Sequence, residues 1–363
     1  MKLISIVGAR PQFIKAAMFS RAIQIHNTED RAETINEQIL HTGQHYDSCM
    51  SEIFFNDLGI PRPTWMLDCA ERQHGRMTGR MLIEIEEILL AERPDYLIVY
   101  GDTNSTLAGA LAACKLHIPI VHIEAGLRSF NREMPEEINR ILVDHASSIL
   151  CCPTYESLRH LSSEGITKGV HHVGDIMYDA ALFFSNIADK NSDALSRLNL
   201  KTKTFRLCTI HRAENTDNPE RLAEIIESIT RMAQADCPVV FPVHPRTEGR
   251  LRESGLKDKL DSSKYVRLLP PLGFLDMVML EKHAKTIITD SGGIQKEAYF
   301  HRTPCITLRD ETEWTETVAA GWNTLAGHKS AQILSCLDID MEKKEIPEYG
   351  TGRTASAIID LLV

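Results

Sequence analysis

Carboxylates, arginines and a histidine gather within residues 102–140, directly after short apolar runs at residues 97–100 and 118–123. Parallel strands read as unbroken apolar runs, and in open α/β sheets ligands bind beyond the carboxyl ends of the strands. Soluble domains seldom place so much charge at such positions without a function. The stretch is therefore expected to form one wall of an active site. Its carboxylates include Asp102, Glu124 and Glu136.

A second candidate site is the glycine-containing loop at residues 290–297, between an apolar run at 286–289 and a helical pattern at 294–300. Consecutive glycines let the backbone approach a ligand, and free amides at the start of a helix favour a phosphate. Glu297 lies six residues beyond Ser291, which is about 9 Å along a helix axis. That distance fits the reach from a diphosphate to a ribose diol. The loop alone leaves a plain strand-to-helix turn with a surface glutamate as an equal alternative.

Cationic and imidazole side chains also follow predicted strands. Arg10 and Lys15 lie at the start of a helix that follows the apolar run at residues 3–7. Cations are unfavourable beside the positive end of a helix, so the pair indicates a nearby anion rather than a solvated basic surface. His211 and His244 each follow a predicted strand. Two histidines at strand ends favour a functional role over two unrelated polar residues.

Strand and helix patterns alternate along the chain, which is typical of doubly wound parallel sheets. The 363 residues have room for two domains of ordinary size. We predict an α/β protein of two Rossmann-like domains facing across a cleft, at residues 1–170 and 171–351, with a C-terminal helix at 352–363 that packs back on the first. Expected strands are residues 3–7, 37–42, 96–100, 118–123, 148–152, 205–210, 238–243, 266–269, 286–289 and 305–308, with helices at 50–58, 77–90, 107–116, 219–235, 294–300 and 355–362 and another starting at Pro135.

The composition excludes several classes of partner. Acidic residues outnumber basic ones by 50 to 40, and the net charge of −10 argues against nucleic acid or an acidic membrane as a general partner. No apolar run approaches the ~20 residues of a membrane span, and the N-terminus lacks a signal-peptide layout. A cytoplasmic protein is therefore expected.

Neither a metal site nor a bound cofactor is expected. The nine cysteines include no C-x-x-C pair, and Cys114, Cys208 and Cys305 lie in apolar runs, as buried free thiols do. His211 and His244 lack the ligand spacing of a zinc site. There is no G-x-x-x-x-G-K-[ST] loop, and no G-x-G-x-x-G follows the first strand. Neither an NTPase nor a dinucleotide oxidoreductase is supported.

A set of motifs, taken in chain order, resembles those of the non-hydrolysing UDP-N-acetylglucosamine 2-epimerases. The resemblance covers residues 2 to about 320, so the ordered set is far more specific than any single motif. The motifs are GARPQFIK (8–15), TGQH (42–45), GDTNST (101–106), HIEAGLR (122–128), PEEINR (135–140), HRAEN (211–215), HPR (244–246) and DSGGIQKE (290–297).

The resemblance implies a glycosyltransferase-B-like pair of domains, a UDP-sugar substrate, no cofactor and a homodimer. It implies anti elimination of UDP to a 2-acetamidoglycal and re-addition after reprotonation on the other face. The family's catalytic positions match Asp102, Glu124, Glu136 and His211, and its substrate and UDP positions match Arg10, Lys15, Arg212, His244, Phe274, Ser291, Gly292, Gly293, Glu297 and Arg309. Arg140 is expected to orient Glu136, while Arg128, Glu137 and Glu214 are expected in structural ion pairs.

Two cues bear on the substrate and point to different branches. Residues 312–316 read TEWTE where members acting on UDP-N-acetylglucosamine carry TERPE, and Trp314 resembles the branch that acts on UDP-2,3-diacetamido-2,3-dideoxy-glucuronate. Residues 71–73 resemble an allosteric UDP-N-acetylglucosamine element that includes Gln44, Arg72 and Gln73. The first cue favours the diacetamido-uronate. The alternatives in function are a glycosyltransferase of the same fold and a non-catalytic nucleotide-sugar sensor.

Overall fold

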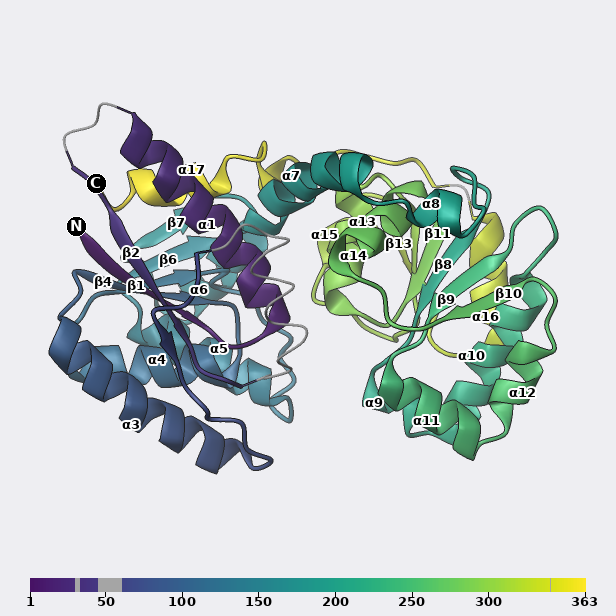
Figure 1. Cartoon of the computed structure of the whole chain (residues 1–363), viewed down its shortest axis with the longest axis horizontal. Helices are drawn as coiled ribbons and strands as arrows, with labels where there is room; N and C mark the ends of the chain where they lie inside the picture. The colour runs from purple at the N-terminus through teal and green to yellow at the C-terminus, as the bar shows by residue number, and fades with distance from the viewer. Residues whose placement is uncertain (30–32, 45–60, 340) are drawn as a thin grey trace. The chain divides into compact units, whose positions relative to one another are not determined.

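The computed structural model describes residues 1–29, 33–44, 61–339 and 341–363, in two compact units (Figure 1). The first unit comprises Met1–Ala180 and Pro347–Val363, and the second comprises Ala181–Ile346. Each is a parallel sheet with connecting helices, which confirms the predicted α/β class. The helix expected at residues 50–58 lies outside the described residues.

The first unit contains a seven-stranded sheet in the order β3-β2-β1-β4-β5-β6-β7. The described pairings are all parallel, and the strand order reverses between the neighbours β1 and β4. Ligand sites in open α/β sheets lie at such a reversal. The strands are β1 Lys2–Val7, β2 Asn36–His41, β3 Trp65–Met66, β4 Tyr96–Tyr100, β5 Ile120–Ile123, β6 Ile149–Cys152 and β7 Val170–His172.

Helices cover this sheet through apolar faces. Ile4 and Ile6 of β1 share one core cluster with buried residues of α3 and α4. Gly109 of α4 lies against that sheet, since an added Cβ would come within 3.1 Å of Ile6. No helix in the described part of the chain is long and apolar enough to cross a membrane. The helices are α1 Arg10–Thr28, α3 His74–Glu92, α4 Asn104–Lys115, α5 Pro135–Ala146, α6 Tyr155–Ser163 and α17 Thr354–Asp360, while α7 Ile176–Asn191 crosses into the second unit.

The last helix of the chain belongs to the first unit. α17 lies beside α1 (Figure 1), and its Ile358 and Ile359 are buried. The amides of Thr354 and Ala355 donate hydrogen bonds to Asp179 of α7, at 3.1 and 2.8 Å. A carboxylate at the start of a helix satisfies free amides and the helix dipole. The chain therefore returns to the first unit through a specific contact.

The second unit contains a six-stranded parallel sheet in the order β10-β9-β8-β11-β12-β13, which reverses between β8 and β11. α10 packs on one face through Leu222, Ile226 and Ile229, in a cluster with Phe241 and Ile288 of the sheet. The strands are β8 Arg206–Thr209, β9 Val239–Pro242, β10 Val266–Leu269, β11 Thr286–Thr289, β12 Cys305–Thr307 and β13 Asn323–Leu325. The helices are α8 Ala194–Arg197, α9 Ala213–Thr216, α10 Pro219–Met232, α11 Pro245–Glu253, α12 Leu256–Asp261, α13 Phe274–His283, α14 Gly292–Phe300, α15 Thr315–Ala319 and α16 Ser330–Ser335, with a 3-10 turn at Cys336–Asp338. A further 3-10 turn, Pro347–Tyr349, belongs to the first unit.

The expected burial of the cysteines is correct for Cys208 and Cys305 and wrong for Cys114. Cys114 lies near the end of α4, on an exposed side of the helix. An apolar run that forms a helix therefore does not imply that every residue of the run is buried. The described cysteines are all free thiols.

A buried carboxyl group lies between the sheet and α1 of the first unit. Glu37 of β2 accepts hydrogen bonds from Ser5 Oγ at 2.6 Å and Ser20 Oγ at 2.5 Å. Tyr100 OH lies 3.3 Å from Ser5 Oγ. Burial raises the pKa of Glu37, and the two serine hydrogen bonds only partly oppose that rise. The folded protein therefore holds the Glu37 proton more tightly than the unfolded chain does.

This raised pKa predicts a loss of stability as pH increases. Below the ordinary Glu value of 4.5 both states are protonated; above it the unfolded chain ionises first, so stability falls until pH passes the folded-state pKa. Between pH 4.5 and neutrality, urea midpoints should fall more steeply for the native protein than for Glu37→Gln. The exposed Glu87→Gln variant is the control. If the urea midpoints of the native protein and Glu37→Gln fell equally with pH, the prediction would be contradicted.

Candidate functional site

In the first unit the predicted catalytic carboxylates follow neighbouring strands. Asp102 lies after β4, and Glu124 directly follows β5. Gly101, between β4 and Asp102, has a positive φ of 60°. A Cβ at Gly101 would lie 3.3 Å from Lys15 Nζ and 4.0 Å from a Glu124 oxygen. The loops after β4 and β5 and the start of α1 therefore meet beside the reversal in strand order.

Asp102 is held by a buried arginine. Its Oδ2 accepts hydrogen bonds from Arg140 Nε at 3.0 Å and Arg140 Nη2 at 2.6 Å. Arg140 also donates to Glu137 at 2.9 Å. The expectation that Arg140 orients Glu136 is therefore wrong, because its guanidinium turns toward Asp102 and Glu137. These two charge-assisted hydrogen bonds to one oxygen hold the Asp102 carboxylate in place.

Glu137 is structural, as expected. It is buried, and it accepts hydrogen bonds from the amides of Ser129 and Phe130 at 2.9 Å each. Burial alone would raise the pKa of Glu137, but these amides and Arg140 hold it below its usual value. Glu136, one residue earlier on the first turn of α5, is exposed. Of the adjacent glutamates, only Glu136 is therefore available to a ligand.

Glu124 pairs with Lys15 of α1. The Lys15 Nζ to Glu124 Oε2 distance is 2.6 Å, with only 6% and 13% of the two side chains exposed. Glu124 has a φ of 73°, which is unusual for a residue with a Cβ and is found most often at functional sites. The two ions form a shielded pair next to Gly101. A charged substrate could replace one member of this pair and bind the other.

Gln44, one of the possible allosteric residues, contacts the start of α4. The Gln44 side-chain oxygen accepts hydrogen bonds from the Ser105 amide at 3.0 Å and from Ser105 Oγ at 2.7 Å. Arg72 and Gln73 are exposed, with Gln73 immediately before α3. The side chain of Arg10 lies outside the described part of the structure.

In the second unit, the predicted residues follow five strands at one edge of the sheet. Carboxyl ends of parallel strands lie together, so loops that follow them line one edge. The residues are His211 and Arg212 after β8, His244 after β9, Phe274 after β10, Ser291, Gly292, Gly293 and Glu297 after β11, and Arg309 after β12.

Asp290 organises the loop after β8, and sequence reasoning missed it as a site residue. Its carboxylate accepts hydrogen bonds from the amides of His211 at 3.1 Å and Arg212 at 3.0 Å. The His211 ring Nδ1 lies 3.3 Å from the same group. Burial would raise the pKa of Asp290, but His211, Arg212 and Asn215 together hold it low. Asp290 therefore orients a half-exposed imidazole. Its place directly before the Ser-Gly-Gly turn was the available signal.

An internal carboxylate lies at the start of α14. Glu313 accepts a hydrogen bond from Arg309 at 2.8 Å and lies 3.9 Å from Arg212. An added Cβ at Gly292 would come within 2.6 Å of a Glu313 oxygen. Burial would raise the pKa of Glu313, but the two arginines lower it. Glu313 was not predicted as a site residue. Because Arg309 and Arg212 meet here beside the free amides at the start of α14, the position suits an anion.

His244 caps α11, with its Nδ1 accepting a hydrogen bond from the Arg246 amide at 3.2 Å. Burial and the charges of His211 and Arg246 lower the pKa of His244. The neutral ring therefore carries its proton on Nε2, as a donor toward a ligand. Phe274 begins α13, and its ring packs edge-on against Phe184 at 5.1 Å.

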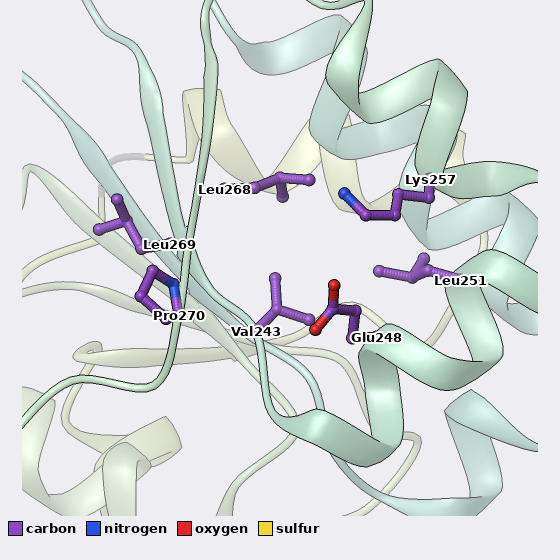
Figure 2. Close-up of a pocket in the computed structure, with 7 residues that line it drawn as sticks. All are labelled: Val243, Glu248, Leu251, Lys257, Leu268, Leu269 and Pro270. Atoms are coloured by element: carbon purple, nitrogen blue, oxygen red, sulfur yellow. The ribbon is translucent and has the colours of Figure 1, made fainter.

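A cavity of about 260 Å³ lies beyond the ends of β9 and β10 (Figure 2). Figure 2 shows the Glu248 and Lys257 side chains reaching toward apolar residues on its opposite wall. Its lining includes no predicted site residue. The lining residues are Val243, Glu248, Leu251, Lys257, Leu268, Leu269 and Pro270.

Trp314, the sequence cue to the substrate branch, is buried. Only 5% of it is exposed, and Lys296 Nζ lies 3.9 Å from its ring centroid. This cation–π contact holds the loop after β12 against α14. Within the described residues, no group of three or more His, Cys, Asp or Glu side chains is arranged to hold a metal ion.

Comparison with known proteins gives matches over the whole chain. The sequence model of the UDP-N-acetylglucosamine 2-epimerase family matches residues 27–363. A UDP-N-acetylglucosamine 2-epimerase homolog of Methanococcus maripaludis is 48% identical over 365 residues, covering 100% of this chain and 99% of the relative. A UDP-2,3-diacetamido-2,3-dideoxy-D-glucuronate 2-epimerase of Pseudomonas aeruginosa is 48% identical over 369 residues, with the same coverage.

Solved structures agree. The crystal structure of the Methanocaldococcus jannaschii UDP-GlcNAc 2-epimerase in complex with UDP-GlcNAc and UDP is similar with a TM-score of 0.89 and 44% identity, covering 100% of this chain and 99% of that one. The Neisseria meningitidis UDP-GlcNAc 2-epimerase bound to UDP-GlcNAc has a TM-score of 0.87 at 29% identity, with the same coverage.

Proposed function

The chain belongs to the UDP-N-acetylglucosamine 2-epimerase family and is an isomerase, and from this membership we propose that it interconverts a UDP-2-acetamido sugar and its C2 epimer. The observation that carries the proposal is the cluster beside Gly101. There, Asp102 accepts hydrogen bonds from the buried Arg140, and Glu124 pairs with the buried Lys15. This cluster lies where ligands of doubly wound sheets bind.

The chemistry requires such groups. No ketone adjoins the C2 proton to acidify it, so the C1–O bond must break as a base removes that proton. UDP leaves with the bonding electrons, and a 2-acetamidoglycal remains. Return of a proton to the opposite face of C2, with addition of UDP oxygen to C1, gives the epimer. Carboxylates stabilise the oxocarbenium-like centre, while cations and amides stabilise the departing diphosphate.

We assign the proton transfers and the stabilisation of the cationic centre to Asp102, Glu124 and Glu136. The hydrogen bonds from Arg140 hold the Asp102 carboxyl group in a fixed orientation. The exposure of Glu136 on the first turn of α5 leaves it accessible to a sugar. The base that removes the C2 proton is one of these three carboxylates.

We assign binding of UDP to the loops of the second unit, assisted by Arg10 and Lys15. Ser291, Gly292 and Gly293 begin α14 and offer backbone amides to the diphosphate. The Nε2 proton of His244 and the guanidinium of Arg212 supply further donors, and Glu297 would accept from the ribose. His211, oriented by Asp290, is the remaining catalytic candidate.

For the natural substrate we propose UDP-2,3-diacetamido-2,3-dideoxy-glucuronate, with UDP-N-acetylglucosamine as the alternative. The Pseudomonas relative and the Trp variant of the TEWTE motif support the first. Because Trp314 is buried against Lys296, its effect on the sugar would act through the position of α14 and not by contact. We further propose a homodimer, a cytoplasmic location and a role in surface polysaccharide synthesis, as the family resemblance implies.

The function is tested by NMR of the purified protein in D₂O with each UDP-sugar in separate samples. We expect deuterium at C2 together with the epimeric UDP-sugar, because every turnover returns a solvent proton to C2. The UDP-sugar that gains deuterium faster identifies the substrate branch of the family. Release of free sugar would instead indicate a hydrolysing epimerase, and UDP binding without C2 deuterium for either sugar would indicate a sensor. A heat-denatured sample is the control.

A further inference from the structure

His122 is a fully buried histidine whose two ring nitrogens both face hydrogen-bond acceptors. It lies on β5 with no exposed surface. Its Nδ1 lies 2.7 Å from Asp144 Oδ1, and its Nε2 lies 2.7 Å from the Gly101 carbonyl oxygen. A carbonyl oxygen can only accept, so Nε2 must carry a proton. The proton count of the ring then depends on Asp144.

Asp144 of α5 behaves as an ionised carboxylate. Its Oδ2 accepts hydrogen bonds from Arg128 Nη1 at 2.7 Å and the Gly126 amide at 3.1 Å. A hydrogen bond from a buried guanidinium favours the ionised form of a carboxyl group. An ionised carboxylate accepts only, so the bond between Asp144 and Nδ1 also needs a proton on the ring.

The charges around the ring are better compensated if the ring is cationic, with Glu164 26% exposed and also facing His145 Nδ1 at 4.0 Å. Arg128 pairs with Asp144 and with Glu164, through 2.7 and 2.8 Å hydrogen bonds to the latter. With a neutral ring, this cluster would hold two carboxylates and one guanidinium. Imidazolium brings it to neutrality, and a balanced cluster avoids the cost of an unpaired buried charge.

We propose that His122 is held doubly protonated and acts as a positioning residue for Asp102, by fixing the Gly101 carbonyl that precedes it. The role rests on the proposed function of Asp102. Gly101 has the left-handed backbone, and the next carbonyl, that of Asp102, accepts a 2.8 Å hydrogen bond from Asn139. With Arg140 on the carboxylate, these contacts hold both the backbone and the side chain of Asp102.

The protonation state is measured on the whole protein by NMR with ¹⁵N-labelled histidine. We expect both ring nitrogens of His122 to carry protons at neutral pH, with its signals assigned by through-bond correlation to the backbone of the native protein. One unprotonated ring nitrogen would overturn the proposal. This measurement needs no substrate, so its result is independent of the proposed reaction.

The positioning role is tested with two variants that each keep one half of the ring's hydrogen bonding. The Asn amide can occupy the Nδ1 position and reach Asp144, whereas the Gln amide can occupy the Nε2 position and reach Gly101. If the Gly101 contact positions Asp102, His122→Asn lowers kcat by about tenfold or more with little change in KM, and His122→Gln retains more activity. If His122 only neutralises Asp144, His122→Asn instead retains more activity than His122→Gln.

His160→Asn is the matched control. His160 also contacts a backbone carbonyl, that of Gly126 at 3.0 Å, but it does not touch the Asp102 loop, so activity should stay near that of the native protein. Equal activity of native protein and His122→Asn would overturn the positioning role even with a doubly protonated ring. If neither variant folds, the NMR result on the native protein decides the protonation claim. Absence of C2 exchange in the native protein would refute only the proposed function.

Discussion

Asp102→Asn should reduce C2 exchange by roughly a thousandfold, the scale on which a positioned acid or base contributes, while UDP still binds. The Asn side chain keeps nearly the same shape, and its oxygen can still accept from Arg140, so the loop after β4 should retain its structure. What is lost is a carboxylate that can take a proton or stabilise positive charge. Rates come from the D₂O experiment, and UDP affinity comes from calorimetry.

A matched control for this variant is Glu214→Gln. Glu214 lies in the HRAEN motif, yet its half-exposed side chain pairs with Arg221 at 2.7 Å, and a pair with a solvent-exposed carboxylate contributes little. Its loss should leave turnover close to that of the native protein. Asp102→Asn with normal turnover would remove Asp102 from the mechanism. Loss of both turnover and UDP binding would instead indicate that the substitution disturbs the fold.

Gly292→Ala should weaken UDP binding by about tenfold to a hundredfold, the loss expected when hydrogen bonds to a charged group are removed. Its Cβ would lie 2.6 Å from a Glu313 oxygen. Glu313 is held by Arg309, so the added methyl group must displace a buried ion pair or move the start of α14. Either change disturbs the amides and guanidinium groups proposed to hold the diphosphate. Titration calorimetry with UDP measures the change.

Two other glycines separate this local effect from a general effect of alanine. A Cβ at Gly293 meets no atom within 4 Å, so Gly293→Ala should weaken UDP binding less than Gly292→Ala does. Gly249, exposed in α11, also has open space around its Cβ, and Gly249→Ala should bind UDP normally. Unchanged affinity in Gly292→Ala would show that UDP does not use the start of α14.

The fold was predictable where strands are continuous apolar runs. Residues 266–269 and 286–289 were predicted with the bounds that the structure has. β3, with two residues, and β13, with the sequence Asn-Thr-Leu, were missed. Neither carries enough apolar residues to form a pattern, and their strand geometry comes from pairing with β2 and β12. Such pairing depends on chain segments that are distant in sequence.

The site was predictable as a set of positions but not as a set of contacts. Asp102 and Glu124 could be placed beyond strand ends because the apolar pattern locates those ends. The partner of Arg140 could not be predicted in this way. Spacing along one helix favoured Glu136, but Asp102, from a different loop, takes the guanidinium. The pairing of Glu313 with Arg212 likewise depends on how the loops after β8 and β12 meet.

The return of residues 347–363 to the first unit has a consequence for biosynthesis. The second unit is an insertion within the first, because α17 packs on α1 and is capped by Asp179. During translation, domains generally fold as they emerge from the ribosome. Here the first unit is completed only when residues 347–363 have been synthesised and α17 can pack on α1. The second unit, whose residues are all synthesised earlier, can therefore fold before the first unit is complete.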